Sequence, residues 1–416
     1  MSQVSRGDDT PSNGGATAEQ SAVPVEELVA RSGALKYELV NFAQQTRFAR
    51  QLTARLQAAR GDGVVVDESA AVRTLDHFAL QYRLHDGTNV VERFIAQRRP
   101  PLAEDERAML LGWRDVVEGL FEVHRTNDCA GTVVLHNLID DLRYVVHSNM
   151  GSEVLDVLEE GMFTHCRIVP VHPATNHWLV SGYLLPYPQI SGPDIARAAL
   201  QMTVDDPGLL RRNPDLYQRA WQIQAEDRAA FIDLFGADLV ILPPATAQER
   251  LTGHYRRRLE EATAAAEANG TPAGPAADSA PRVEEMGRLP KDYMEADSVG
   301  LIYDEIEGLN YYLDFGRLDT LFADPDHVRD RTCITLLRAY LSDDTVSPLP
   351  LRRLIQRHPD GADTVFRVLL RKPGFSWQRD GEELLRTRKK AFIDKEPAPS
   401  YSVVGERLAE LLRTQQ

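Results

Sequence analysis

The first part of the chain carries apolar residues at helical spacing. Leu28, Leu35, Leu39 and Phe42 follow one another at intervals made of threes and fours, which places them on one stripe of an amphipathic helix. Further on, "AEDERAMLLGWRDVVEGL" begins with acidic residues, as the positive end of a helix dipole favours. The pattern predicts a helical region over residues 25–119.

After residue 119 the pattern changes to short runs of β-branched and aromatic residues separated by Asn, Asp and Gly. The runs are "LFEVHR", "GTVVLHNL", "LRYVVH", "HCRIVPV" and "HWLVSGYLL". Several short strands with turn residues between them are typical of a barrel or a tightly curled sheet. We therefore expect a small antiparallel β-barrel-like unit over residues 120–188.

The remaining segments divide by composition. Residues 1–24 are rich in Ser, Gly and Thr with few apolar side chains, so we expect a disordered tail. Helical periodicity resumes over residues 189–268 and gives way to "NGTPAGPAADSAP", which predicts a flexible linker over residues 269–290. Residues 291–416 are expected to form a C-terminal α-rich domain that opens with two strands and carries basic helices. The predicted fold class is α+β, mainly helical, with the β unit inserted between helical regions.

The cysteines and the hydropathy of the chain indicate the cellular compartment in which we expect the protein. No apolar run approaches the roughly eighteen residues that a spanning helix needs, and the first residues lack the apolar core of a secretory signal. Cys129, Cys166 and Cys333 are far apart, without a CxxC pair. This spacing argues against a disulfide framework or a zinc ribbon and fits a reducing compartment. We expect a cytoplasmic protein with neither a membrane nor a disulfide-linked partner.

His165, Cys166, His172 and His177 form the densest group of reactive side chains in the sequence. If "PATN" connects two strands, His172 and His177 face one another across the mouth of a hairpin. Cys166 lies six residues from His172, which is roughly 20 Å along an extended strand and too far for one tetrahedral centre. We therefore interpret the group as part of a folded hairpin, and we expect neither a metal nor a cofactor.

The sequence also lacks several catalytic signatures. It contains no GxxxxGK[ST] phosphate loop, no GxSxG elbow and no HExxH helix. Asp304, Glu305, Glu307 and Asp314 surround a predicted turn and offer oxygen ligands to a divalent cation. A solvated acidic hairpin is the alternative interpretation, since the spacing of a calcium-binding loop is absent.

The charge changes sign near the C-terminus. The whole chain carries a net charge of −15, yet residues 345–416 hold 14 basic and 9 acidic side chains. A basic face with an aromatic ring would suit the phosphates and bases of a nucleic acid. The alternative is that these charges pair within the protein. The candidate nucleic-acid-binding residues are Arg352, Arg353, Arg357, Arg371, Lys372, Trp377, Arg386, Arg388, Lys389 and Lys390.

Three stretches resemble a family of uncharacterised bacterial proteins, some of which carry a SEC-C motif. They are "RFIAQRRPPLAEDERAMLLGWRDVVEGLFEV", "GMFTHCRIVPV" and "HWLVSGYLLPYP", within residues 90–188. The resemblance implies a β unit after a helical lead-in and brings no assigned activity. The cysteine-rich motif itself is absent here, so its metal binding is not implied.

These observations favour a binding or regulatory protein over an enzyme. In this hypothesis the basic C-terminal segment contacts nucleic acid or another polyanion. One alternative is a divalent-metal-dependent hydrolase that uses the acidic turn at residues 304–314. Another is a protein–protein interaction scaffold that uses the β unit.

Overall fold

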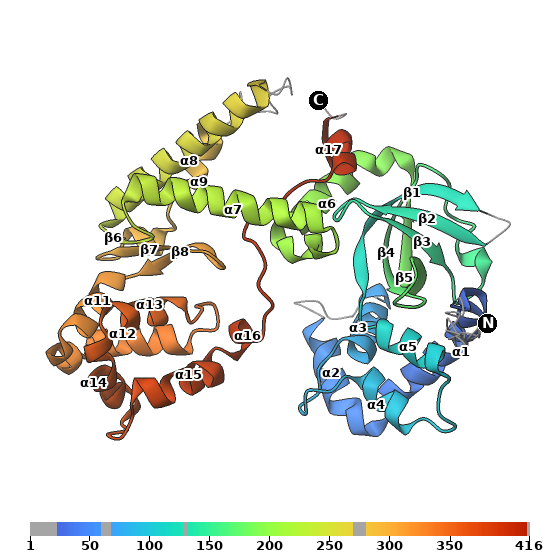
Figure 1. The fold of residues 1–416 in the computed structure, drawn as a ribbon, viewed down its shortest axis with the longest axis horizontal. Helices are drawn as coiled ribbons and strands as arrows, with labels where there is room; N and C mark the ends of the chain where they lie inside the picture. Colours follow the sequence, from blue (N-terminus) through green and yellow to red (C-terminus); the bar gives the residue numbers. More distant parts are fainter. Residues whose placement is uncertain (1–22, 60–67, 128–130, 269–279, 414–416) are drawn as a thin grey trace, which may run out of the picture. The chain divides into compact units, whose positions relative to one another are not determined.

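The computed structural model describes residues 23–59, 68–127, 131–268 and 280–413, and the chain divides into two compact units (Figure 1). Unit 1 comprises Met1–Ala199 and Glu410–Gln416, and unit 2 comprises Leu200–Ala409. The predicted α+β, mainly helical class is confirmed. Almost all of the predicted N-terminal tail and residues 269–279 of the predicted linker lie outside the described residues. No helix in the described residues is long and apolar enough to cross a membrane.

Unit 1 begins with a group of helices around an apolar core. Leu35, Phe42, Phe78, Leu110 and Trp113 are buried in it, which confirms the predicted stripe of the first helix. The first five helices, all in unit 1, are α1 (Val25–Ala43), α2 (Ala49–Ala58), α3 (Glu68–Leu80), α4 (Val90–Gln97) and α5 (Glu104–Gly112).

Five strands follow the helices, at the places where the sequence predicts them. They are β1 (Val117–Asn127), β2 (Thr132–Asn137), β3 (Arg143–His147), β4 (Phe163–Pro170) and β5 (His177–Tyr187). In the order β1-β2-β3-β5-β4, with β4 paired back to β1, the sheet closes on itself. The expectation of a wholly antiparallel unit is wrong at one seam, because β3 and β5 are parallel. The strand that follows β3 along the chain is β4, but β4 pairs with β1 and β5. The strand that pairs with β3 is therefore β5.

Side-chain alternation gives the closed sheet two different faces. Cys166, Ile168 and Val180 point into the apolar interior of the sheet. Val169 and Leu179, one residue away from Ile168 and Val180, pack with the helices instead. Because side chains alternate along a strand, neighbouring odd-numbered positions of β4 and β5 also face the helices. Polar residues at those positions form the site described below.

Unit 2 is built around a three-stranded antiparallel sheet of order β6-β7-β8. Tyr303 packs against Phe231 and Phe235 of α7, whereas Ile302 packs into a core with Leu318 of α11. Helices therefore cover both faces of the sheet. The strands are β6 (Leu239–Leu242), β7 (Val299–Asp304) and β8 (Gly308–Leu313). The helices from α6 onward are α6 (Gly192–Asp205), α7 (Pro214–Phe235), α8 (Pro244–Ala268), α9 (Ala280–Met286), α10 (Lys291–Met294), α11 (Phe315–Ala323), α12 (Arg331–Ser342), α13 (Leu349–Arg357), α14 (Pro359–Leu370), α15 (Trp377–Arg388), α16 (Lys390–Ile393) and α17 (Glu406–Arg413).

The grouping of segments in unit 2 differs from the predicted division. β6 comes from the predicted helical region and pairs with β7 of the predicted C-terminal domain, so the two segments share one sheet. Within the range predicted as a linker, α9 is helical, and Val283 and Leu289 are buried. These apolar positions stand in a segment whose composition otherwise indicates a linker.

Candidate ligand-binding site in unit 1

A network of buried charges joins the helices of unit 1 to the closed sheet. Lys36 comes from α1, Asp76 from α3, Glu118 from β1, Arg167 from β4 and Ser181 from β5. Arg167 and Ser181 occupy the helix-facing positions that the alternation along β4 and β5 creates. Asp76, Arg167 and Ser181 are almost fully buried, so their polar atoms must be satisfied within the protein.

Hydrogen bonds connect these groups. The Lys36 ammonium donates to Asp76 Oδ1 and, at 2.9 Å, to Ser181 Oγ. Ser181 Oγ donates to the same carboxylate oxygen at 2.9 Å. Arg167 donates from Nε to Asp76 Oδ2 at 3.1 Å, from Nη1 to Glu118 and from Nη2 to Gln81 Oε1 at 3.0 Å. Two cations and two carboxylates of the network thus face one another, and the exposed Arg73 also lies 3.6 Å from Glu118.

The charges around Asp76 decide its protonation state. Burial by itself raises the pKa of a carboxyl group, because it disfavours the ionised form. The nearby Lys36 ammonium and Arg167 guanidinium outweigh burial and hold the pKa of Asp76 below its usual value. Asp76 is therefore ionised. The contact between the helices and the sheet depends on three charged groups, Lys36, Asp76 and Arg167, each of which neutralises another.

At the outer end of the network, Glu118, Tyr183 and His165 form a chain of hydrogen bonds. Tyr183 Oη donates to Glu118 Oε1 at 3.0 Å and lies 2.9 Å from His165 Nε2. Since the phenol proton is committed to Glu118, His165 donates to it from Nε2. Burial lowers the pKa of His165, and burial with the negative charge of Glu118 raises the pKa of Tyr183. The imidazole and the phenol are thus both neutral near pH 7.

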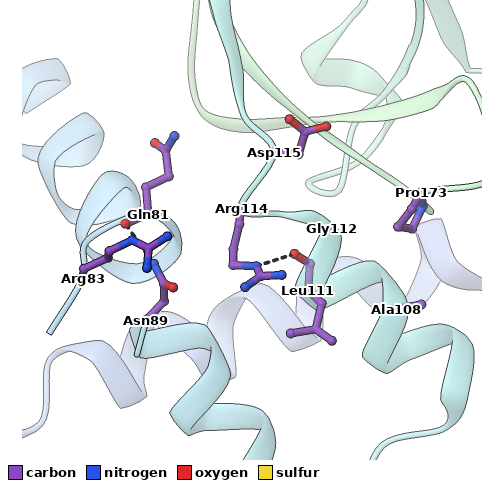
Figure 2. Close-up of a pocket in the computed structure, with 9 residues that line it drawn as sticks. All are labelled: Gln81, Arg83, Asn89, Ala108, Leu111, Gly112, Arg114, Asp115 and Pro173. Atoms are coloured by element: carbon purple, nitrogen blue, oxygen red, sulfur yellow. Dashed lines mark hydrogen bonds between the residues drawn. The ribbon is translucent and has the colours of Figure 1, made fainter. Parts of the chain in front are cut away.

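Gln81 connects the network to an open pocket with a cavity volume of about 720 Å³ (Figure 2). The pocket lies between the α3–α4 connection, α5 and the loop that joins β4 to β5. The side chain of Gln81 accepts from Arg167, and its backbone oxygen accepts from Asn89 Nδ2 at 2.9 Å. Asn89 also caps α4 in a capping box with Glu92. This wall of the pocket is therefore held in place by the network behind it.

Two guanidinium groups, those of Arg83 and Arg114, point into the pocket (Figure 2). Arg114 donates from Nε to Leu111 O at 3.0 Å and pairs with Glu92 at 2.5 Å. Arg83 is exposed and has no ion pair among the described residues. Asp115 is the acidic residue among the described lining residues. Glu92 therefore neutralises Arg114, and Arg83 is the cation of the described lining that has no ion pair.

The histidines and the cysteine of the predicted hairpin do not come together. Cys166 lies inside the closed sheet, where burial raises the pKa of its thiol, and His165 is held by Tyr183. His172 Nδ1 accepts from the backbone of Ala174, and His177 contacts His147 of β3. His172 and His177 thus have separate partners and do not share a site across the hairpin mouth. No group of three or more potential metal ligands occurs among the described residues.

The His147–His177 contact predicts a loss of stability in mild acid. His147 Nε2 lies 2.9 Å from His177 Nδ1 at the β3–β5 seam, and burial together with His177 lowers the pKa of His147 to about 4. Between about pH 6.5 and pH 4, His147 is protonated in the unfolded chain but stays neutral in the folded protein. The free energy of unfolding therefore falls as the pH falls through this range. Urea unfolding of unit 1 across this range measures the effect.

The matched substitutions are His147→Gln and His85→Gln. His147→Gln should flatten part of the pH dependence, whereas His85→Gln, at an exposed turn, should leave it unchanged. Only part should disappear, because burial also lowers the pKa of His77 and His165. An unchanged slope in His147→Gln would contradict the assignment.

The predicted acidic turn is organised by its own hydrogen bonds. Asp304 Oδ1 accepts from the backbone of Ile306 and Glu307 at 2.9 and 3.1 Å. Asp314 Oδ1 accepts from the backbone of Asp297 at 2.8 Å, and Glu307 accepts from Ser347. Glu305 lies 3.8 Å from Arg228. The four carboxylates have different partners and form no common cluster among the described residues.

Several of the predicted nucleic-acid-binding residues are engaged within unit 2. Arg352 pairs with Glu382 at 2.8 Å, Arg353 with Asp238 at 2.5 Å, Arg357 with Asp319 at 3.1 Å and Arg386 with Glu383 at 2.8 Å. This arrangement matches the alternative in which these charges pair internally.

Two of the predicted nucleic-acid-binding residues, Lys389 and Trp377, are fully or partly covered by other parts of unit 2. Lys389 is buried, and its ammonium donates to Asp343 O at 2.5 Å, so its inclusion in an exposed basic face is wrong. Trp377 packs on Phe366 with ring centroids 4.7 Å apart, which leaves it half-buried. Arg371, Lys372, Arg388 and Lys390 are exposed and make no ion pair within the described part of the chain.

The match to a known protein family lies in unit 1. A family model described as a family of unknown function (DUF7986) matches residues 30–199, less than half of the chain. The matched range contains every residue of the buried network and of the pocket, and it includes the stretch from residue 90 to 188 that resembles uncharacterised proteins. No curated protein and no solved structure shows a significant match.

Proposed function

We propose that this protein is a binding or regulatory protein, not an enzyme, and that it recognises an anionic group in the pocket of unit 1. The observation that carries the proposal is the exposed Arg83 guanidinium, which points into the pocket beside Arg114 without an acidic partner among the described residues. Guanidinium groups bind carboxylates and phosphates through paired, charge-assisted hydrogen bonds. The closed sheet serves as a barrel-like scaffold that keeps the wall of the pocket rigid.

Two features support a binding role. Apart from Asp115, the polar side chains that line the pocket are amides and guanidiniums, which orient a ligand without exchanging protons near neutral pH. The charged groups behind the pocket, Lys36, Asp76 and Arg167, are paired with one another. Such groups can hold the wall of the pocket in place, but they are not free to act on a substrate. A polyanion contact through Arg371, Lys372, Arg388 and Lys390 is the alternative within the same class.

Calorimetric titration with citrate and inorganic phosphate tests the proposal. A charge-assisted hydrogen bond contributes about 1.5–3 kcal/mol, so Arg83→Gln should weaken binding at least about tenfold. Arg107→Gln removes the same charge from the exposed side of α5 and should bind like the unsubstituted protein. Equal binding by both variants would place the anion elsewhere, and absence of binding to the unsubstituted protein would reject the proposal.

A further inference from the structure

Unit 2 contains a second, more enclosed cavity of about 520 Å³. It lies between β8, α10, α12, α16 and the loop after α12. Four tyrosines line it together with Phe392. Glu307 and Asp343 are its acidic residues, and no lining residue among those described is basic. An aromatic wall with acidic groups and no cation is a composition suited to a positively charged ligand.

Hydrogen bonds to the protein fix the tyrosine rings. Tyr340 Oη donates to Leu313 O at 2.6 Å, and Tyr293 Oη donates to Tyr311 O at 3.2 Å. The Tyr311 hydroxyl lies 3.1 Å from that of Tyr255. Because these three hydroxyls are committed, Tyr293, Tyr311 and Tyr340 offer a ligand mainly their rings.

The rings stand in two pairs. The centroids of Tyr312 and Tyr340 are 6.2 Å apart, and those of Tyr293 and Tyr311 are 6.5 Å apart. A cation is attracted by an aromatic ring when it lies within about 6 Å of the ring centroid. Tyr311 and Tyr312 are consecutive on β8 and pack in different cores, so one small ammonium group can approach both rings of a pair but not all four rings.

Glu307 supplies a negative charge in this aromatic setting. Its Oε2 accepts from Ser347 Oγ at 2.5 Å, and the side chain has no ion pair among the described residues. Burial and neighbouring Asp304 raise the pKa of Glu307, and the hydrogen bond from Ser347 and the charge of Arg352 oppose this rise without cancelling it. An incoming cation would offset this cost of burying the carboxylate. The Lys389 ammonium donates to the backbone oxygen of Asp343, which also lines the cavity, so the proposal rests on the Glu307 carboxylate and not on Asp343.

We propose that the cavity binds a small organic ammonium ligand. Its ammonium group lies beside the rings of Tyr312 and Tyr340 and the Glu307 carboxylate, with its apolar substituent toward Leu336 and Phe392. This site is separate from the anion pocket of unit 1, so either proposal can fail alone. The ligand class follows from the two kinds of attraction available, cation–π contact and a carboxylate.

Calorimetric titration of the full chain with benzyltrimethylammonium and with neutral benzyl alcohol tests the site. We expect the ammonium to bind and the alcohol to bind at least about tenfold more weakly. Glu307→Gln keeps the shape of the side chain and should reduce ammonium affinity about tenfold or more. Glu305→Gln, on the same turn, removes an exposed carboxylate outside the cavity and should have no effect.

Three results would overturn the proposal. They are equal affinity for the ammonium and the alcohol, unchanged ammonium affinity in Glu307→Gln, and no binding with a Kd below about 10 mM. The comparison of the two probes on the unsubstituted protein decides the question even if Glu307→Gln does not fold.

Discussion

Asp76→Ala should lower the free energy of unfolding of unit 1 by about 3–5 kcal/mol, the usual cost of removing one partner from a buried ion pair. The substitution leaves Lys36 and Arg167 facing each other without the carboxylate that neutralises them. Arg167 keeps Glu118 as a partner, whereas Lys36 keeps the Ser181 hydroxyl and the Trp113 ring, 5.4 Å from its ammonium, but no carboxylate. Urea unfolding near pH 7, followed by circular dichroism, measures the loss.

Two further variants distinguish the loss of the buried ion pairs from the general effect of removing a carboxylate. Asp105→Ala, which lies 3.9 Å from His172 and is half-exposed, should cost less than about 1 kcal/mol. Adding Lys36→Met to Asp76→Ala should recover part of the loss, because it removes the unpaired ammonium. A loss under about 1 kcal/mol in Asp76→Ala would show that the network contributes little.

Gly361→Ala should destabilise unit 2 by about 1–3 kcal/mol or more, the usual range for an overpacked interior. Gly361 lies in the first turn of α14, where a Cβ atom would stand 2.0 Å from the backbone oxygen of Phe322 in α11. A backbone atom cannot rotate away as a side chain can, so the two helices must separate. Their contact includes Phe322 and Phe366, whose ring centroids are 5.9 Å apart.

The matched control for Gly361→Ala is Gly253→Ala within α8. A Cβ atom at Gly253 would meet nothing within 4 Å, and replacing glycine in a helix interior by alanine usually adds about 0.5–1 kcal/mol. Thermal unfolding should therefore shift in opposite directions for the two variants. A shift in the same direction for both would contradict the steric argument.

Local patterns in the sequence predict most elements of this fold. The alternation in "HCRIVPV" and "HWLVSGYLL" places β4 and β5, and the spacing of Leu28, Leu35, Leu39 and Phe42 places α1. The parallel β3–β5 seam is not predictable in this way, because it depends on the order in which distant strands pair. The same limit applies to β6, whose partner β7 follows it by about sixty residues.

The candidate site is less predictable from the sequence, because its residues are isolated charges inside apolar runs. Arg167 stands in "HCRIVPV" and Asp76 in "TLDHFAL", and neither forms a motif with its neighbours. A charged residue on the helix-facing side of a buried strand is nevertheless a signal, since it needs a partner. The clustering of basic residues near the C-terminus does not by itself indicate a free basic face, because Glu382, Asp238 and Asp319 neutralise members of that cluster.

The ring of strands in unit 1 also bears on self-association. A strand with neighbours on both sides offers no free backbone edge to another molecule, and a closed sheet protects all of its strands at once. Here that protection depends on its shortest seam, where β3 and β5 share three residue pairs beside the two histidines. Opening that seam would expose two strand edges simultaneously, so the acid-weakened seam is also the point from which strand-to-strand aggregation would begin.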